Sequence, residues 1–257
     1  MQLPFYKYQG TGNDFVMIDN RHAIFPKNNT RLVAQLCDRR FGIGADGLIL
    51  LEDHAAVDFT MVYYNADGNL SSMCGNGGRC ITHFAKFLGV INDNATFEAV
   101  DGMHTATVEG GIVKLKMNDV SSVSVEKDFV FLNTGSPHHV QLVDSLEQYD
   151  VFSEGKRIRN TIYGSEGANV NFVTQVGSDI FSVRTYERGV EDETLSCGTG
   201  VTAVAIAMHA ILKTEATTIA LQTPGGNLKV YFEKTQKGYE NVYLEGAAKQ
   251  VYKGEWS

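Results

Sequence analysis

The segment Cys74-Gly-Asn-Gly-Gly78 has a near copy later in the chain, Cys197-Gly-Thr-Gly-Val201, and this pair of segments decides the fold that we expect. The offset between them, 197 − 74, is 123 residues. Other short matches recur at the same offset and in the same order: Thr11-Gly12-Asn13 with Thr134-Gly135-Ser136, Gly44-Ala45-Asp46 with Gly167-Ala168-Asn169, Tyr63 with Tyr186, and Asp101-Gly102 with Pro224-Gly225. A shared register of this kind indicates an internal repeat, so we interpret the chain as two homologous halves.

The length of the chain fits two halves of this size. Its 257 residues, with a mass of 28.2 kDa, allow one large domain or two domains of roughly 100–150 residues. We predict that residues 1–118 form the first half and residues 119–246 the second. The tail, residues 247–257, belongs to neither repeat, and we expect it to pack on the first half.

Both halves show the same order of predicted elements. A β-rich run comes first, followed by a polar turn, the Cys-Gly segment and a helix. The run and the helix are Asp58–Asn65 and Asn76–Leu88 in the first half, and Ile180–Tyr186 and Thr199–Lys213 in the second. Gly89 is the expected cap at the end of the first helix.

Strands return after each helix. Glu109-Gly110-Gly111 lies between two β-rich runs and predicts a hairpin, and Leu228–Glu233 with Asn241–Glu245 repeats that pattern. The second helix contains VTAVAIAMHAIL, which is apolar on nearly every face and is typical of a buried central helix. We therefore predict an α+β fold of two pseudo-symmetric halves. Each is a mostly antiparallel sheet wrapped around a buried central helix, and the active site is expected in the cleft between the halves.

The composition excludes several classes of protein. Lys and Arg number 22 against 30 Asp and Glu, and the net charge of −8 argues against nucleic-acid binding. The most apolar stretch, Val201–Leu212, is too short for a membrane span, and residues 1–15 lack the apolar region of a signal peptide. Four cysteines in a chain of this length do not form a disulfide scaffold. We expect a soluble cytoplasmic protein with reduced thiols.

Each half places a cysteine directly before a Gly-x-Gly sequence and a helix. A thiol at a helix N-terminus lies at the positive end of the helix dipole, which favours its thiolate form. The unpaired N–H groups there can hold a carboxylate, and the glycines allow a ligand to approach closely. If the halves pack about a pseudo-two-fold axis, Cys74 and Cys197 lie on opposite sides of one small anionic ligand.

Two opposed thiols suit the inversion of a carbon centre. A base removes the proton from one face and an acid returns a proton to the other, and a thiol and thiolate pair can do this in both directions. The carbon acid would be an amino acid, activated without a cofactor by hydrogen bonds to its carboxylate.

Other interpretations of the cysteines and glycines fit the sequence less well. Cys37 and Cys80 fit small core residues better than catalytic ones. Neither zinc nor a thioredoxin-type redox pair is expected, because the CxxC spacing is missing and no histidines cluster nearby. The glycine-rich stretch Gly42–Gly47 lacks both the Walker lysine and the dinucleotide fingerprint.

The sequence resembles the diaminopimelate epimerase family over essentially its whole length. The matching blocks are Gly10-Thr-Gly-Asn-Asp-Phe15, Phe41-Gly-Ile-Gly-Ala-Asp46, Asn65-Ala-Asp-Gly68, Met73-Cys-Gly-Asn-Gly77 with Arg79-Cys80, Pro137-His138, Asn169-Val-Asn-Phe172, Tyr186-Glu-Arg-Gly189 and Glu193-Thr-Leu-Ser-Cys-Gly-Thr-Gly200. Proline racemases, which have the same fold, share the two-cysteine plan but not this set of blocks.

The resemblance implies an isomerase without a cofactor that interconverts LL- and meso-2,6-diaminopimelate, in lysine and peptidoglycan precursor biosynthesis. It implies Cys74 and Cys197 as acid and base, and His138 and Glu187 as neighbours that adjust the pKa of the thiols. The substrate-binding residues that it implies are Asn13, Asn65, Gly75, Asn76, Asn169, Glu187, Arg188, Gly198 and Thr199. No metal is implied.

The side chains in this set suit diaminopimelate, which carries two amino groups and two carboxylates. Arg188 can bind a carboxylate bidentately, and Glu187 can pair with an ammonium group. Two positions depart from the family pattern. Ser136 stands where the family usually has asparagine, which makes it a weaker contact, and the stretch from Arg188 to Cys197 is one residue longer than usual.

The sequence alone leaves two other functions open. One is a proline-racemase-like or other isomerase of the same fold that needs no cofactor. The other is a non-catalytic amino-acid-binding or thiol-redox protein, against which the presence of both Cys74 and Cys197 speaks. The partner expected in every case is a small molecule, with no nucleic acid and no membrane, and the assembly left open is a homodimer.

Overall fold

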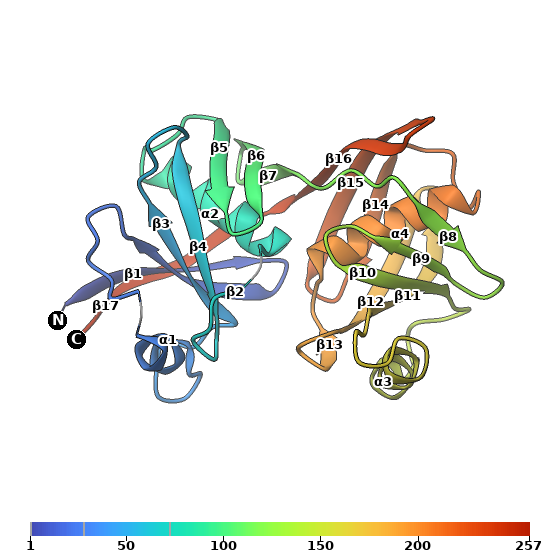
Figure 1. Cartoon of the computed structure of the whole chain (residues 1–257), viewed down its shortest axis with the longest axis horizontal. Coiled ribbons are helices and arrows are strands. Elements are labelled where there is room, and N and C mark those ends of the chain that lie inside the picture. Colours follow the sequence, from blue (N-terminus) through green and yellow to red (C-terminus); the bar gives the residue numbers. More distant parts are fainter. Residues whose placement is uncertain (1, 28, 72) are drawn as a thin grey trace. The chain divides into compact units, whose positions relative to one another are not determined.

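A computed structural model describes residues 2–27, 29–71 and 73–257. The chain divides into two compact units (Figure 1), one made of Met1–Leu115 with Gly246–Ser257 and the other of Lys116–Glu245. No helix in the described ranges is long and apolar enough to cross a membrane.

The first unit is a sheet that surrounds helix α2 (Figure 1). Strand β17 pairs with β1, and the pairing continues in the order β2, β3, β4, β5, β6 and β7. The pairs β2 with β3 and β4 with β5 are parallel, and the others are antiparallel. The elements are β1 (Leu3–Gly10), β2 (Asn13–Asp19), α1 (Thr30–Cys37), β3 (Gly47–Glu52), β4 (Phe59–Asn65), α2 (Gly75–Phe87), β5 (Asn94–Ala99), β6 (Gly102–Glu109), β7 (Ile112–Lys116) and β17 (Lys249–Trp256).

The second unit repeats this arrangement around helix α4. Its strands pair in the order β8, β9, β10, β11, β12, β14 and β15, with parallel pairs at β10 with β11 and at β12 with β14. The elements are β8 (Val123–Val125), β9 (Val130–Asn133), β10 (Pro137–Leu142), α3 (Val151–Thr161), β11 (Asn169–Gly177), β12 (Ile180–Glu187), β13 (Asp192–Thr194), α4 (Gly198–Ala210), β14 (Thr218–Thr223), β15 (Gly226–Thr235) and β16 (Gly238–Ala247). Parallel pairs at matching places in both units confirm the pseudo-symmetric α+β prediction.

The start of α2 depends on glycines that allow close packing. A Cβ added at Gly78 would lie 2.5 Å from Cε of Met73, and one added at Gly77 would lie 3.0 Å from Cδ1 of Ile49. The helix ends at Phe87, and Gly89 follows with a φ of +72°, which is the predicted cap. The first turn of α2 can therefore lie close against the sheet.

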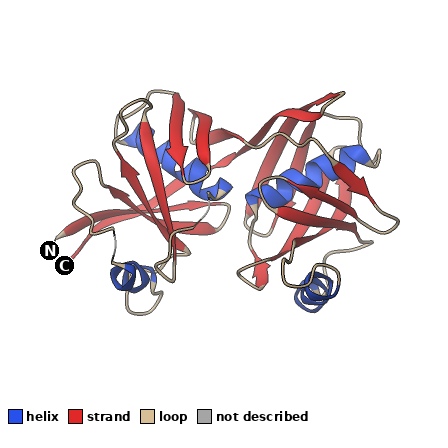
Figure 2. Ribbon diagram, in the orientation of Figure 1, coloured by secondary structure: helices blue, strands red, loops and turns tan. Residues whose placement is uncertain are grey.

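Helix α4 is almost wholly buried, as its uniformly apolar sequence predicts. The strands of the second unit surround it (Figure 2). The predicted end at Lys213 is wrong, because the helix stops at Ala210. Leu212 has a φ of +58°, and the N–H of Lys213 donates a hydrogen bond to the carbonyl of Met208. A left-handed residue there closes the helix without a glycine, which the apolar pattern could not reveal.

Helix α3 was not predicted from the sequence. The Asp150 side chain caps its N-terminus by accepting a hydrogen bond from the Ser153 N–H at 3.0 Å. Val151 and Ile158 face the core, but the rest of the helix is strongly polar, so its apolar face is narrow. The predicted hairpin at Gly110 and Gly111 is confirmed, and both residues have positive φ.

Candidate active site

Cys74 precedes the first residue of α2 and occupies its N-cap position. Its backbone is extended, with φ −110° and ψ 125°. An N-cap residue adjoins the N–H groups of the first turn, which have no partner within the helix. The thiol is half-buried, and its Sγ lies 3.5 Å from Oδ1 of Asn13, at the start of β2. The structure thus brings Cys74 together with three predicted contact residues, Asn13, Gly75 and Asn76.

A chain of hydrogen bonds fixes the amides beside this thiol. Asn76 Nδ2 donates to Asn13 Oδ1 at 3.3 Å, and Asn13 Nδ2 donates to Asp46 Oδ2 at 2.6 Å. The Thr11 hydroxyl donates to Asn76 Oδ1 at 3.4 Å and accepts from Arg79 at 3.0 Å. The carbonyl oxygen of Asn13 is therefore the atom that it presents toward the sulfur.

Cys197 occupies the same position at the start of α4. Its φ is −115° and its ψ is 113°, close to the values at Cys74, and only 7 % of the residue is exposed. Its Sγ lies 3.5 Å from the Thr199 hydroxyl, and the Thr199 carbonyl accepts a hydrogen bond from the Thr134 hydroxyl at 2.9 Å. Gly198 is the first helical residue. Both cysteines are thus N-caps with nearly the same backbone conformation.

His138 is fully buried on β10, where burial, with a smaller contribution from the Arg188 charge, lowers its pKa to about 3. Its Nδ1 lies 3.2 Å from Nδ2 of Asn171, which also donates to the His139 carbonyl at 3.0 Å. The low pKa keeps the ring neutral, so only one of its two nitrogens carries a proton.

Asn169 and Arg188 meet at the edge of the same sheet. Asn169 Oδ1 accepts the backbone N–H of Arg188 at 2.9 Å, and its Nδ2 lies 3.5 Å from Nε2 of His138. The Arg188 guanidinium is exposed and donates to the carbonyl of Glu166 at 2.9 Å. These contacts join three predicted residues, Asn169, His138 and Arg188, in one network.

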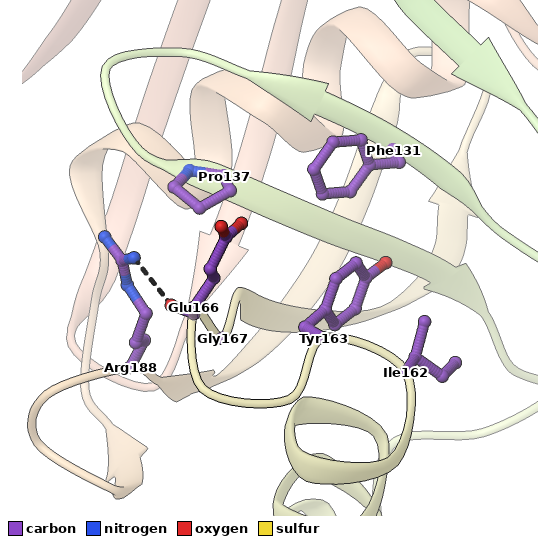
Figure 3. A pocket seen from close by; sticks show the side chains of 7 residues that line it. All are labelled: Phe131, Pro137, Ile162, Tyr163, Glu166, Gly167 and Arg188. Atoms are coloured by element: carbon purple, nitrogen blue, oxygen red, sulfur yellow. Dashed lines mark hydrogen bonds between the residues drawn. The ribbon is translucent and has the colours of Figure 1, made fainter.

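Arg188 lines a pocket of about 440 Å³ in the second unit (Figure 3). The Glu166 side chain points into it, and aromatic rings form one wall. The lining residues are Phe131, Pro137, Ile162, Tyr163, Glu166, Gly167 and Arg188. An exposed guanidinium beside a carboxylate can bind the carboxylate and the ammonium group of an amino acid.

The remaining predicted residues, Asn65, Ser136 and Glu187, lie close in the chain to residues of these networks. Asn65 is exposed at the end of β4, and its described hydrogen bonds are made by its backbone, from its N–H to the carbonyl of Asn69 and from the Gly68 N–H. Ser136 is half-buried and its carbonyl accepts the Thr134 N–H. Glu187 is half-buried at the end of β12, and its carbonyl accepts the Glu191 N–H.

Sequence reasoning missed several residues at these positions. Asp46 and Arg79 lie in matching blocks but were given no role, and Asn171 lies in a third block. Glu166 and Tyr163 follow α3, which was not predicted, so no signal placed them near Arg188. In the described ranges no group of three or more His, Cys, Asp or Glu residues could hold a metal ion.

Comparisons with known proteins identify the family of the chain. The family model for diaminopimelate epimerase matches residues 5–128 and 130–251. The diaminopimelate epimerase of Flavobacterium psychrophilum is 57 % identical over 97 % of this chain and 98 % of that protein. The diaminopimelate epimerase of Chlorobaculum tepidum is 42 % identical over 95 % of this chain and 98 % of that protein.

Solved structures show the same fold at low sequence identity. A PhzF-family phenazine biosynthesis protein from Bacillus anthracis superposes with a TM-score of 0.81 at 12 % identity, covering 100 % of this chain and 99 % of that one. A probable proline racemase from Agrobacterium radiobacter gives a TM-score of 0.68 at 14 % identity, covering 99 % and 93 %. The fold is thus shared more widely than the sequence blocks, and the chain belongs to the diaminopimelate epimerase family.

Proposed function

We propose that this protein is an isomerase that interconverts LL- and meso-2,6-diaminopimelate without a cofactor, in lysine and peptidoglycan precursor biosynthesis. The observation that carries the proposal is the occurrence of a cysteine at the N-cap of both central helices, in a chain that belongs to the diaminopimelate epimerase family. A fold shared with a probable proline racemase does not by itself specify the substrate.

The proposed chemistry needs one thiolate and one thiol. The thiolate of one cysteine removes the proton from the α-carbon and becomes a thiol. The thiol of the other cysteine gives its proton to the opposite face and becomes a thiolate, so the overall charge is unchanged. The reverse reaction exchanges the two roles. Cys74 and Cys197 are the residues proposed for these steps.

The intermediate carries negative charge that spreads from the α-carbon onto its carboxylate. Backbone N–H groups at a helix N-terminus are fixed donors for such charge, and they need no reorganisation during the reaction. Gly75 and Asn76 supply these donors at α2, and Gly198 and Thr199 supply them at α4. The carboxylate is therefore proposed to bind at the helix ends that hold the thiols.

The far end of the substrate is proposed to bind to polar side chains. Arg188 is exposed beside the Glu166 pocket and can receive a carboxylate, and Glu187 can pair with an ammonium group. Asn13, Asn65 and Asn169 can both donate and accept, which suits the mixed polarity of an amino acid.

His138 is proposed to act on its surroundings as a neutral ring. Its pKa of about 3 keeps it uncharged through the physiological range, so it does not supply a positive charge to a thiol. Together with Glu187 it is proposed to tune the thiol of the second half through the dipole of the neutral ring. The protein is further proposed to work in the cytoplasm. A homodimer is also proposed, and light scattering would test for it.

A stereochemical assay tests the function. The purified protein should convert LL-diaminopimelate into the meso isomer until both are present at equilibrium. It should leave L-proline and trans-4-hydroxy-L-proline unchanged under the same conditions. Inversion of proline in place of diaminopimelate would favour the proline-racemase-like alternative, and binding of diaminopimelate without inversion would favour a non-catalytic protein.

A further inference from the structure

Arg79 is a buried cation whose hydrogen bonds are incomplete. The residue lies on α2 with 0 % of its surface exposed, and its Nη2 donates to the Thr11 hydroxyl at 3.0 Å. Its Nε and Nη1 are also buried, and neither has a hydrogen-bond partner among the described residues. A guanidinium removed from water needs a counter-charge, because burial without one is strongly unfavourable.

The guanidinium lies under the first turn of the helix that Cys74 caps. A Cβ built on Gly10 would be 3.3 Å from Nη2 of Arg79 and 3.3 Å from the carbonyl oxygen of Asn76. Thr11 joins Arg79 to Asn76, and Asn76 in turn contacts Asn13 beside the thiol. Burial lowers the pKa of Arg79, and charge interactions with Cys80 and Cys74 oppose that change.

The other titratable groups around Arg79 stay neutral. Burial raises the pKa of the Cys80 thiol to about 12 and also raises the pKa of Tyr8, on β1. Burial lowers the pKa of His83, on the same helix, with Lys86 acting in the same direction. None of these groups supplies a negative charge near neutral pH, which leaves Cys74.

The charged side chains beyond Asn13 balance one another. Asp14 pairs with Lys7 and Arg39, and Asp46 pairs with Arg39, so two carboxylates face two cations. Asn13 itself opposes a thiolate, since its carbonyl oxygen accepts from the Cys74 sulfur at 3.5 Å. A thiol is a weak donor, however, so the full charge of a buried guanidinium outweighs that contact.

The second half has no equivalent cation. At the offset of 123 residues Arg79 corresponds to Thr202, whose hydroxyl donates to the Gly198 carbonyl at 2.9 Å. His138 is neutral, and Arg188 is exposed and therefore screened by water. Glu187, on β12, carries a negative charge, and His209 lies at the opposite end of α4. The Thr199 hydroxyl beside Cys197 can either donate or accept.

We propose that Arg79 is a positioning residue that makes the two thiols unequal, so that Cys74 holds the negative charge and Cys197 the proton in the enzyme without substrate. The inference deepens the proposed function and depends on it for the roles of the two cysteines. The charge assignment itself can be tested without turnover.

Alkylation by iodoacetamide tests the assignment, because only a thiolate displaces iodide efficiently. The modified fraction of each cysteine is followed against pH by peptide mass spectrometry. The pH midpoint of the alkylation rate reports the ionisation of each thiol, and the plateau rate at high pH reports how easily the reagent reaches it. The deeper burial of Cys197 therefore does not affect the comparison of the two midpoints. We expect the midpoint of Cys74 to lie at least one pH unit below that of Cys197.

Variants locate the cause of this difference. Arg79→Met should raise the Cys74 midpoint by about one pH unit or more and leave Cys197 unchanged, whereas Arg79→Lys should preserve most of the difference. Asn13→Ala should lower the Cys74 midpoint, because it removes the opposing carbonyl. Thr202→Val is the matched control in the second half and should leave the midpoint of Cys74 unchanged.

Equal midpoints in the unaltered protein, or a lower midpoint at Cys197, would overturn the proposal. So would a folded Arg79→Met variant in which Cys74 ionises as before. If circular dichroism shows that this variant does not fold, the pH midpoints of the two thiols in the unaltered protein still test the proposal. Normal epimerisation with equal midpoints would refute only this inference, and unequal midpoints without epimerisation would refute only the proposed function.

Discussion

The N-terminal ends of helices α2 and α4, capped by Cys74 and Cys197, have nearly the same backbone conformation but different surroundings. Both cysteines cap a buried helix with an extended conformation. Behind the first lies the buried Arg79 guanidinium, and the corresponding residue behind the second is Thr202, whose hydroxyl donates to the Gly198 carbonyl. The repeat thus preserves the N-cap geometry of the two cysteines, while the residues behind them differ. This difference suggests how two similar halves can give an acid and a base at the same time.

The groups that contact the two sulfur atoms also differ between the halves. Cys74 faces an amide whose orientation is fixed, since Asn13 donates to Asp46 at 2.6 Å. Cys197 faces the Thr199 hydroxyl, which can rotate to donate or accept. A fixed acceptor and an adjustable hydroxyl respond differently when a thiol changes its protonation state.

The largest expected effect is the loss of either thiol. Cys74→Ala and Cys197→Ala should each lower kcat for diaminopimelate epimerisation by about 10²–10⁴-fold, because each removes the acid or the base for one face. The stereochemical assay measures this loss, with circular dichroism as the check on folding. Near-normal turnover in either variant would show that the two halves are not both needed.

A smaller effect is expected at the carboxylate contact of the second half. Arg188→Lys keeps the positive charge but loses the planar fork that matches a carboxylate. We expect kcat/KM to fall by about 10–100-fold with little change in the unfolding midpoint. Unchanged kinetics would assign Arg188 to holding the Glu166 loop through its 2.9 Å hydrogen bond, with no part in binding substrate.

Acid should weaken the second half through its buried histidines. The pKa values of His138 and His139 are lowered by burial from 6.5 to about 3 and about 4. The unfolded chain binds these protons below pH 6.5 but the native protein does not, so stability is retained above pH 6.5 and falls as the pH drops toward 4. Each histidine contributes about 1.4 kcal/mol per pH unit in that window.

Urea unfolding at several pH values measures this slope. His138→Gln should flatten the acid-side slope by the share of one histidine, whatever it does to stability at pH 7. Hydrogen exchange should place the acid-induced loss mainly in the second half, since the first half has only the half-buried His83 of this kind. A slope that is the same in the variant would contradict burial of His138 as a neutral ring.

The smallest effect is expected at the other two cysteines. Cys37 and Cys80 are buried in the first unit, and burial raises the pKa of each thiol to about 12. Cys37→Ala and Cys80→Ala should lower the free energy of unfolding by at most about 1–2 kcal/mol and leave turnover near normal. A large loss of activity with normal stability would give one of them a direct role.

Most of the fold could be predicted from the sequence because the chain contains an internal repeat. Matches at an offset of 123 residues placed the central helices, the strands before them and the hairpins, because all of these leave local patterns. Helix α3 was not predicted because its buried face is narrow. The end of α4 was predicted wrongly because a non-glycine residue, Leu212, takes the left-handed conformation.

The site was partly predictable for a similar reason. The thiols and their glycines stand out as a repeated motif, and the contacts of Asn13 and Asn169 follow from blocks shared with a known family. The unpaired nitrogens of Arg79 could not be foreseen, since the depth of its burial depends on how β1 and the Thr11 turn pack against α2. The Glu166 pocket depends likewise on the loop after α3.

The fate of the α-proton in D₂O tests the central claim, that two different thiols serve the two faces of one carbon. LL-diaminopimelate is mixed with the enzyme in D₂O, and product and remaining substrate are separated in the first few per cent of the reaction. We expect meso product with one deuterium at the inverted carbon, because the acid thiol has exchanged with solvent, and remaining substrate that still carries protium. Product that retains protium at that carbon, or deuterium that enters the substrate as fast as the product, would contradict the claim.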